Sequence, residues 1–265
     1  MTYLSLTAVD LVAAAALFLI NGLLSWGFRL GLVKSLAVAA LRMVIQLGAI
    51  GFVLKFVFEQ SSPLLTAALA LFMVLAAGHE ALARPERRPG GWRAYGLGTG
   101  TLFLVGLIVT LYTTAVVIGS EARLAPRYLL PILGMVLGNA LTGVSLVFGT
   151  MAETAERERG AIEARIALGQ ARLEALSDVT RAGLRTGLMP ILNAMAASGV
   201  VALPGMMTGQ ILAGADPVEA AKYQIMIMFV IAGATALSVT LAALGTAWLI
   251  TDARHRLRLD RLTRR

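Results

Sequence analysis

The sequence predicts an all-α integral membrane protein with seven transmembrane helices, the N-terminus outside and the C-terminus in the cytoplasm. Of its 265 residues, 58% are hydrophobic and only 14% are charged, and the mean hydropathy is +0.79. Soluble domains contain about a quarter charged residues, so this composition indicates a chain that lies mostly in lipid. The absence of cysteine excludes disulfides, thiolate metal sites and cysteine nucleophiles.

The apolar stretches have the length that membrane helices need, which is about 20 residues to cross roughly 30 Å of hydrocarbon. The predicted spans are Leu11–Phe28, Leu36–Val57, Leu64–Ala83, Leu97–Ile118, Tyr128–Thr150, Leu188–Leu212 and Lys222–Ile250. The first ten residues contain no Lys or Arg and do not resemble a secretory signal peptide, so we interpret the first stretch as a retained span. We therefore expect one transmembrane domain over residues 1–265.

Basic residues predict the orientation. Alternate connections between the spans contain eighteen Lys and Arg on one side and two on the other. The basic side is expected to be cytoplasmic, because positively charged loops stay inside. It includes the run from Arg254 to Arg265, which we interpret mainly as a topology anchor that contacts anionic lipid headgroups. Because the net charge of +8 lies in such loops, nucleic-acid binding is disfavoured.

The long connection 151–187 is predicted to be a small amphipathic, cytoplasmic helical element. Three glycines are expected to divide it: Gly160, Gly169 and Gly183. Within it, Glu163, Ala164 and Gly169 form an E-A-x-x-x-x-G pattern, similar to the EAA loop of ABC transporter permeases, a short helix and turn that docks on a cytoplasmic ATPase. A glutamate and small residues on one face would fit a groove, and glycine permits a bend. On spacing alone, an ordinary surface helix is the alternative.

The sixth span is predicted to break at Leu203–Gly205, because proline removes a helix hydrogen bond and glycine relaxes the backbone. Broken helices at membrane depth lie inside protein or beside a cavity, so this break is either a substrate region or a packing kink. The candidate substrate pathway consists of Arg42, Gln46, Asn139, Pro204, Gly205, Met206, Met207 and Gln224. For Arg42, a structural bridge between helices is the alternative. No metal ligands are assigned, because methionine is also an ordinary apolar residue of membrane helices.

Glycine pairs at i,i+4 are candidates for close helix contacts. They are Gly96 with Gly100, Gly134 with Gly138, and Gly205 with Gly209.

Several longer stretches resemble the FetB-type (YbbM-type) membrane permeases, which include plant aluminium-sensitivity permeases. The stretches are Arg42-x-x-x-Gln46, Pro131-Ile132-x-Gly134-Met135-x-x-Gly138-Asn139-Ala140, Leu203-Pro204-Gly205-Met206-Met207-x-Gly209 and Lys222-Tyr223-Gln224-Ile225-Met226. The resemblance implies the permease subunit of an ABC transporter in a bacterial inner membrane, paired with a second copy and a separate ATPase subunit. Bacterial members are associated with iron export and peroxide resistance, and plant relatives with aluminium tolerance and a nucleotide-sugar.

ATP and Mg would be bound by that partner subunit, because no G-x-x-x-x-G-K-[ST] motif occurs in this chain. Two alternatives remain open. One is ABC export of a nucleotide-sugar or a phosphorylated organic anion, for which Arg42 would contact the anion. The other is a secondary carrier that works without an ATPase. No catalytic residue is assigned, because two histidines without a cysteine suggest no nucleophile–base pair.

Overall fold

The protein is described by a computed structural model that covers residues 7–60, 62–119 and 125–264. The chain divides into two compact units, Met1–Ser61 and Ser62–Arg265. Both units are mainly helical, as the sequence predicts for an all-α membrane protein.

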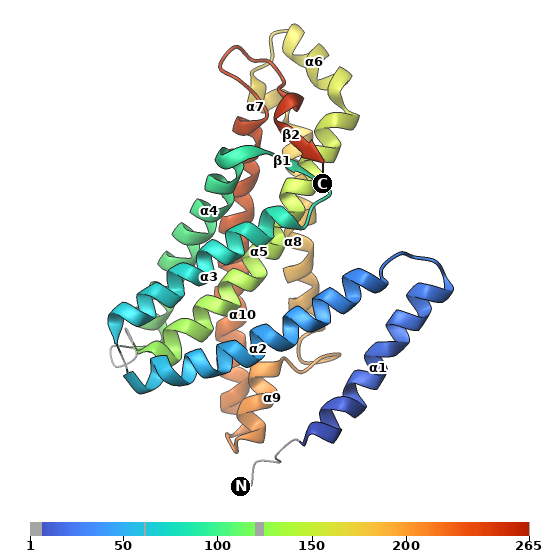
Figure 1. Ribbon diagram of the computed structural model, residues 1–265. Coiled ribbons are helices and arrows are strands. Elements are labelled where there is room, and N and C mark those ends of the chain that lie inside the picture. The colour runs from blue at the N-terminus through green and yellow to red at the C-terminus, as the bar shows by residue number, and fades with distance from the viewer. Residues whose placement is uncertain (1–6, 61, 120–124, 265) are drawn as a thin grey trace. The chain divides into compact units, whose positions relative to one another are not determined.

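The first unit is a helical hairpin of α1 (Ala8–Gly27) and α2 (Val33–Gln60) (Figure 1, blue). Thr7 caps α1 in a capping box with Asp10. Along both helices the large apolar side chains are almost all exposed, and Val57 is an exception. A helix that is apolar all round is typical of one that meets lipid or other membrane helices.

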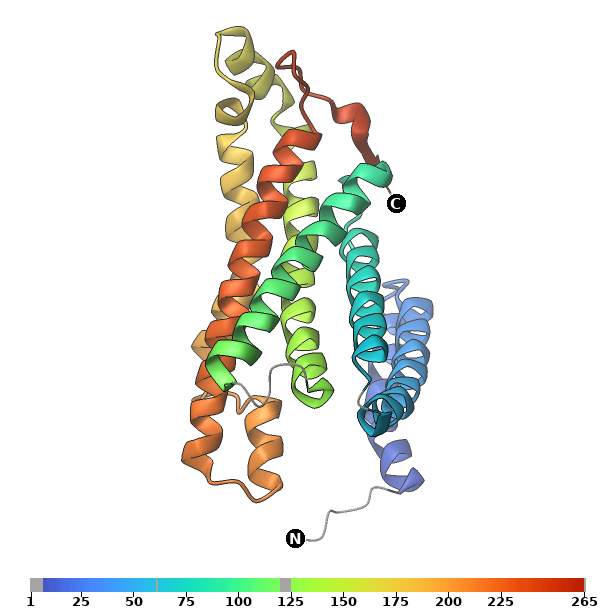
Figure 2. The ribbon, with the colours of Figure 1, turned by 90° about the vertical axis from the view of Figure 1, so that its left-hand side faces the viewer.

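The second unit contains the remaining helices and a small two-stranded sheet (Figures 1 and 2). Its elements are α3 (Pro63–Ala83), β1 (Arg87–Pro89), α4 (Gly91–Tyr112), a π-helical turn (Thr113–Ile118), α5 (Pro126–Arg157), α6 (Arg159–Ala167), α7 (Arg172–Ala175), α8 (Ser177–Ala197), α9 (Gly205–Leu212), α10 (Pro217–Leu249), a 3₁₀ turn (Leu259–Arg261) and β2 (Leu262–Arg264). β1 and β2 pair antiparallel, with Arg88 opposite Thr263.

Helix α5 is the centre of the second unit and packs against α3, α4, α8 and α10. Its fully buried Val144, Phe148 and Met151 form the middle of the main apolar core. Gly143 and Gly187 let α5 and α8 approach closely: a Cβ on Gly143 would lie 2.9 Å from the carbonyl oxygen of Gly187. Close helix packing through small residues is the usual way that membrane helices associate.

Two expectations about glycine are wrong within this chain. Gly160 lies inside α6 and Gly183 inside α8, so neither divides the 151–187 segment. Gly183 instead makes room for Met151, whose Cγ would be 2.6 Å from an added Cβ. The predicted glycine pairs are also not close helix contacts: five of the six would accept a Cβ with nothing within 4 Å, and Gly134 alone would meet a neighbour, the Met73 side chain.

Among the described residues, six helices are long and apolar enough to cross a membrane. They lie at Val9–Gly27, Val33–Gln60, Pro63–Ala83, Gly91–Ile118, Pro126–Arg157 and Pro217–Leu249. The interval predicted as the sixth of seven spans, Leu188–Leu212, is not one helix: α8 ends at Ala197 and α9 begins at Gly205. The break therefore begins earlier than predicted and ends where it was predicted. The count of seven and the orientation of the termini remain predictions.

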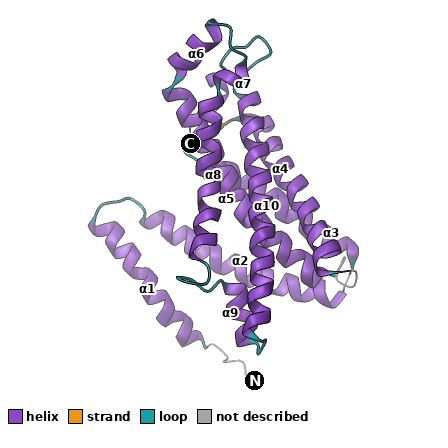
Figure 3. Cartoon of the chain, turned by 180° about the vertical axis from the view of Figure 1, so that it is seen from behind, coloured by secondary structure: helices purple, strands orange, loops and turns teal. Residues whose placement is uncertain are grey.

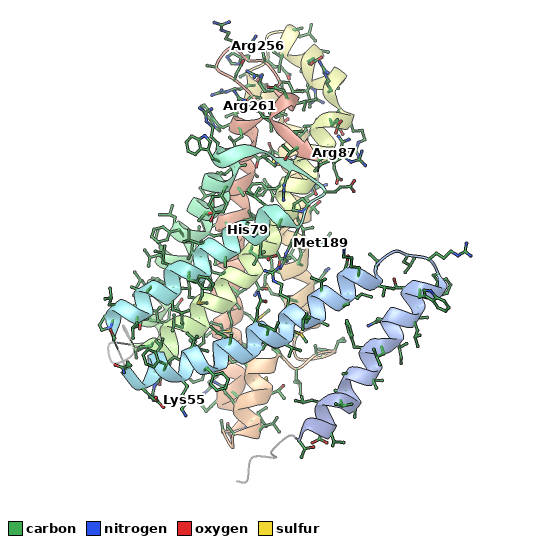
Figure 4. All side chains as sticks on the ribbon, viewed as in Figure 1. Lys55, His79, Arg87, Met189, Arg256 and Arg261 are labelled. Carbon is green, nitrogen blue, oxygen red and sulfur yellow. The ribbon has the colours of Figure 1, made fainter. Side chains whose placement is uncertain are left out.

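The two ends of the second unit differ in composition. Figure 3 shows α6 and α7 at one end and α9 at the other. The end with α6 and α7 also contains β1, β2 and the C-terminal segment, and Figure 4 labels Arg87, Arg256 and Arg261 there. We call it the arginine-rich end.

Candidate functional site

The predicted coupling residues lie on a short helix at the arginine-rich end. We call α6 and α7 together, residues Arg159–Ala175, the coupling element, after the role that the sequence predicts for it. Ile162 anchors it, with 1% of its surface exposed in the main core. Glu163 and Ala164 are exposed, and Glu163 accepts a hydrogen bond from Arg159 Nε at 2.8 Å. The helix thus keeps an apolar side for the bundle and presents the predicted glutamate and alanine outward.

Gly169 ends α6 in a left-handed conformation, with φ +93°. The N–H of Gly169 donates to Ile166 O at 3.0 Å, and that of Gln170 donates to Arg165 O at 3.1 Å. These two bonds form a Schellman motif, which glycine satisfies without steric cost. Leu168, just before the glycine, is 86% exposed. The result is a sharply turned tip with one protruding apolar side chain.

Ion pairs and ring contacts hold the coupling element in place. Arg165 Nη2 lies 2.8 Å from Asp178 Oδ2 at the start of α8. The Arg172 guanidinium lies 3.6 Å above the ring of Trp248, in the last turn of α10. The coupling element is therefore connected to both α8 and α10 by named side-chain contacts.

Sequence reasoning missed a folded C-terminal segment, residues 251–264, which we call the C-terminal clasp. Thr251 pairs with Leu257 in an isolated bridge, and Arg261 Nη1 donates to Leu249 O at 2.7 Å. Leu257 and Leu259 pack against the main core. The basic run is thus part of the fold. Its alternation of Leu with Arg is the sequence pattern that could have predicted this packing.

Asp252 closes the first turn of the clasp. Its Oδ1 accepts the backbone N–H groups of Arg254 and Arg256 at 2.9 and 3.0 Å. The Arg256 backbone N–H is the largest of the contacts that hold the pKa of Asp252 down, at about 2, and the Arg256 guanidinium and the Arg254 N–H act in the same direction. His255 follows within the turn with φ +55°.

The predicted pathway residues belong to both units. Arg42 and Gln46 lie on the exposed surface of α2, in the first unit. The other six lie in the second unit. Asn139 is on α5, Pro204 is the N-cap of α9, Gly205, Met206 and Met207 are on α9, and Gln224 is on α10.

Met206 and Gln224 lie at the end of the second unit opposite the coupling element. Pro204 is the N-cap of α9, and Met206 packs against a second apolar cluster that includes Ile227. Met135, Met195 and Met228 pack against the same cluster, so four helices each contribute one methionine to it. Met207 is half-buried and Gly205 is exposed.

Gln224 combines burial with an unmet hydrogen-bonding group. It is 8% exposed, and its amide oxygen has no hydrogen-bond partner among the described residues. An unpaired buried acceptor costs free energy and therefore requires an explanation. The Thr110 hydroxyl on α4 is likewise buried and unpaired in the described part of the chain. Within that part, no cluster of three His, Asp or Glu is placed to hold a metal ion.

Asn139 lies elsewhere, on a polar stripe along α5. Its Nδ2 donates to Met135 O at 2.9 Å, and the side chain is exposed. Further along the same helix face, Thr142 accepts a hydrogen bond from Arg84 Nη1 at 3.4 Å, and Glu153 is exposed. A groove of about 350 Å³ follows this face between Thr142 and Glu153, with Arg84 on its other side. Asn139 is therefore exposed on α5, whereas Gln224 is buried on α10.

Comparison with known proteins identifies the family. The model of the uncharacterised protein family UPF0014 matches residues 8–249. The chain belongs to the UPF0014 family. This confirms the resemblance to the FetB-type permeases, because the *Escherichia coli* probable iron export permease protein FetB is 30% identical over 261 residues, which cover 98% of each chain.

Two plant relatives of this UPF0014 member are also similar. The rice UPF0014 membrane protein STAR2 is 35% identical over 229 residues, 86% of this chain and 78% of that protein. The *Arabidopsis thaliana* protein ALUMINUM SENSITIVE 3 is 32% identical over 226 residues, 85% of this chain and 81% of that protein. No solved structure matches. Family membership and the apolar helices together identify a multi-pass membrane protein of a permease family.

Proposed function

We propose that this chain is the permease subunit of an ABC-type exporter, that a separate ATPase subunit binds its coupling element, and that iron is the leading cargo. It would work as a homodimer in a bacterial inner membrane, with the arginine-rich end in the cytoplasm. ATP and Mg would bind the ATPase subunit. The chain would supply the transport pathway, and the ATPase subunit would supply the free energy of ATP hydrolysis.

The observation that supports coupling most directly is the tip at Gly169. A rigid helix that ends in a Schellman turn presents Leu168, Glu163 and Ala164 to the outside. A protruding apolar side chain beside small residues fits a concave protein surface. The tip also lies at the arginine-rich end, which the positive-inside rule places in the cytoplasm, where an ATPase would be.

The polar stripe on α5 supports a pathway between two copies of the chain. Asn139, Thr142 and Glu153 share one face of a helix long and apolar enough to span the membrane. Polar side chains at membrane depth avoid lipid and face protein or water. Two α5 helices that face each other would place these groups along a common polar path.

Iron is the leading cargo because FetB, a relative over the full length, is named a probable iron export permease. A phosphorylated or nucleotide-linked organic anion is the second candidate. It is favoured by the position of Arg42 within the membrane-spanning helix α2, because a cation at membrane depth often marks a substrate pathway and would meet an anionic substrate there.

Transport by inside-out vesicles tests the proposal. Vesicles that contain this chain and its ATPase subunit should accumulate labelled iron when ATP is added, and should not do so with an ATPase mutant that cannot hydrolyse ATP. Assembly of the two subunits without iron accumulation would overturn the iron assignment, and competition by nucleotide-sugars would then test the second candidate. Transport by the lone chain under an ion gradient would contradict the ATPase-driven mechanism.

Cysteine cross-linking tests the homodimer, because the chain has no native cysteine. Asn139→Cys should form disulfide-linked dimers in membranes upon mild oxidation. Phe229→Cys, which is 66% exposed on α10, is the matched control and should remain monomeric. Dimers at Phe229 but not at Asn139 would place the interface on α10 instead.

A further inference from the structure

Arg172 contacts two segments of the chain at once. It is the first residue of α7, three positions after Gly169. Its backbone N–H donates to His255 Nδ1 at 3.2 Å, and its guanidinium lies 3.6 Å above the Trp248 ring. One residue of the coupling element is therefore bound both to the end of α10 and to the C-terminal clasp.

The backbone contact fills a place that the local sequence leaves open. Ala171 is the N-cap of α7 and has no side chain that could accept a hydrogen bond. The imidazole of His255, 83 residues further along the chain, accepts the N–H of Arg172, one of the first N–H groups of α7 that have no acceptor within the helix. Its position is fixed by the Asp252 turn, in which the His255 N–H donates to Asp252 O at 3.1 Å. The acceptor is thus held by a closed turn that begins three residues after α10 ends.

The side-chain contact reaches the end of a long, continuous helix. α10 runs from Pro217 to Leu249 with its proline at the first position, so no residue interrupts it. Trp248 lies 24 positions after Gln224, about 36 Å along the axis at 1.5 Å per residue. A displacement of Trp248 would move the helix that carries the buried Gln224.

We infer that Arg172 is a positioning residue that transmits movement of the coupling element to α10. This inference rests on the proposed function, in which an ATPase subunit moves the coupling element. Arg165 makes the corresponding link to α8 through Asp178. The coupling element therefore acts on α8 through Arg165 and on α10 through Arg172.

A fluorescent reporter on α10, far from the joint, tests the inference without knowledge of the cargo. Ile225→Cys would carry an environment-sensitive fluorophore as the single cysteine of the chain; it is 56% exposed and adjacent to Gln224. The chain is reconstituted with the ATP-binding protein that co-purifies with it, and the change in fluorescence upon ATP addition is recorded. Binding of the ATP-binding protein and thermal stability are measured in parallel.

We expect Arg172→Ala and Trp248→Leu to reduce the ATP-dependent signal at least fivefold, with binding and thermal stability preserved. Arg172→Lys and Trp248→Phe keep a cation and a ring, so each should restore at least half of the signal. Arg157→Ala is the matched control: it removes an exposed arginine of the same end whose ion pair is local, with the adjacent Glu158 at 3.5 Å, and should leave the signal unchanged.

A signal within twofold of the parent in Arg172→Ala would overturn the inference and leave the proposed function standing. Loss of ATP-binding-protein association in Arg172→Ala would also overturn it, because Arg172 would then be a docking contact. A parent chain that binds no ATP-binding protein, or that shows no response to ATP, would overturn the proposed function and this inference together.

Discussion

The arginine-rich end and the membrane core of the second unit are held together by different forces. At the end, directional contacts dominate: the Schellman bonds at Gly169, the Arg165–Asp178 ion pair and the Arg172–Trp248 stack. In the core, packing dominates, with Gly143 against Gly187. Directional contacts can be broken and remade singly, whereas a packed core resists small displacements. The difference suggests that substitutions at the end should alter coupling, and those in the core should alter stability.

The largest effect is expected where the core is tightest. Gly143→Ala would place a methyl group 2.6 Å from Val239 Cγ2 and 2.9 Å from Gly187 O, and backbone cannot move aside cheaply. Overpacking of this kind costs about 1–3 kcal/mol. We expect a clearly lower melting temperature in detergent. Gly138→Ala on the same helix is the control, since nothing lies within 4 Å of its added Cβ. Equal melting temperatures for the two variants would contradict the packing argument.

Gly169 should show the opposite separation, with coupling changed much more than stability. Gly169→Val forces a β-branched residue to φ +93°, a left-handed conformation that costs about 1–2 kcal/mol. The strain falls on an exposed turn, so we expect ATP hydrolysis to continue while transport per ATP drops about tenfold.

Gly169→Asn is the control for this position, because asparagine tolerates the left-handed region and should keep most of the coupling. Gly160→Ala, inside α6 with open space around it, should be neutral or slightly stabilising. Full coupling in Gly169→Val would show that the turn geometry is not needed.

The sequence predicts the local features of this structure, and it misses those that depend on contacts between distant residues. Continuous apolar runs predict six membrane helices well, because the signal is local. The turn at Gly169 was also predicted, since glycine is a local signal for the end of a helix. By contrast, Gly143 meets Gly187 on another helix and does not stand in a glycine pair; Gly187 does, four positions after Gly183, but that spacing does not say which helix it contacts.

The C-terminal clasp was missed for a similar reason. Its stability depends on contacts with distant parts of the chain, such as β1, and on the hydrogen bond from the Arg172 N–H to His255 Nδ1, 83 positions apart. From its charge alone we interpreted the run as a lipid anchor. A basic run beside a span is compatible both with contact to lipid headgroups and with a folded segment. The candidate pathway likewise could not be assembled by sequence, since spacing does not tell that Asn139 is exposed on α5 whereas Gln224 is buried on α10.

Gln224 is one of the buried polar side chains that have no hydrogen-bond partner among the described residues. Removal of its unpaired buried amide oxygen in Gln224→Leu should raise stability by about 1 kcal/mol. If the residue serves the pathway, transport should fall in the same variant. Ser238→Ala is the control: it removes a second buried polar group of α10, a hydroxyl without a hydrogen-bond partner among the described residues, and should leave transport unchanged. Normal transport in Gln224→Leu would remove this residue from the pathway.

The smallest expected effect is a loosening of the clasp at low pH. Hydrogen bonds led by the Arg256 N–H hold the pKa of Asp252 at about 2, below its ordinary value of 3.8. A lowered folded-state pKa stabilises the clasp above about pH 4, and that contribution is lost as the pH falls from about 4 through 2. With Trp26 and Trp92 replaced by Phe, emission from Trp248 should shift to the red over this range as the Arg172 stack opens. Asp252→Asn should show the shifted emission already at neutral pH. A transition of unchanged size in Asp252→Asn would assign it to other carboxylates, and the clasp would then not depend on this turn.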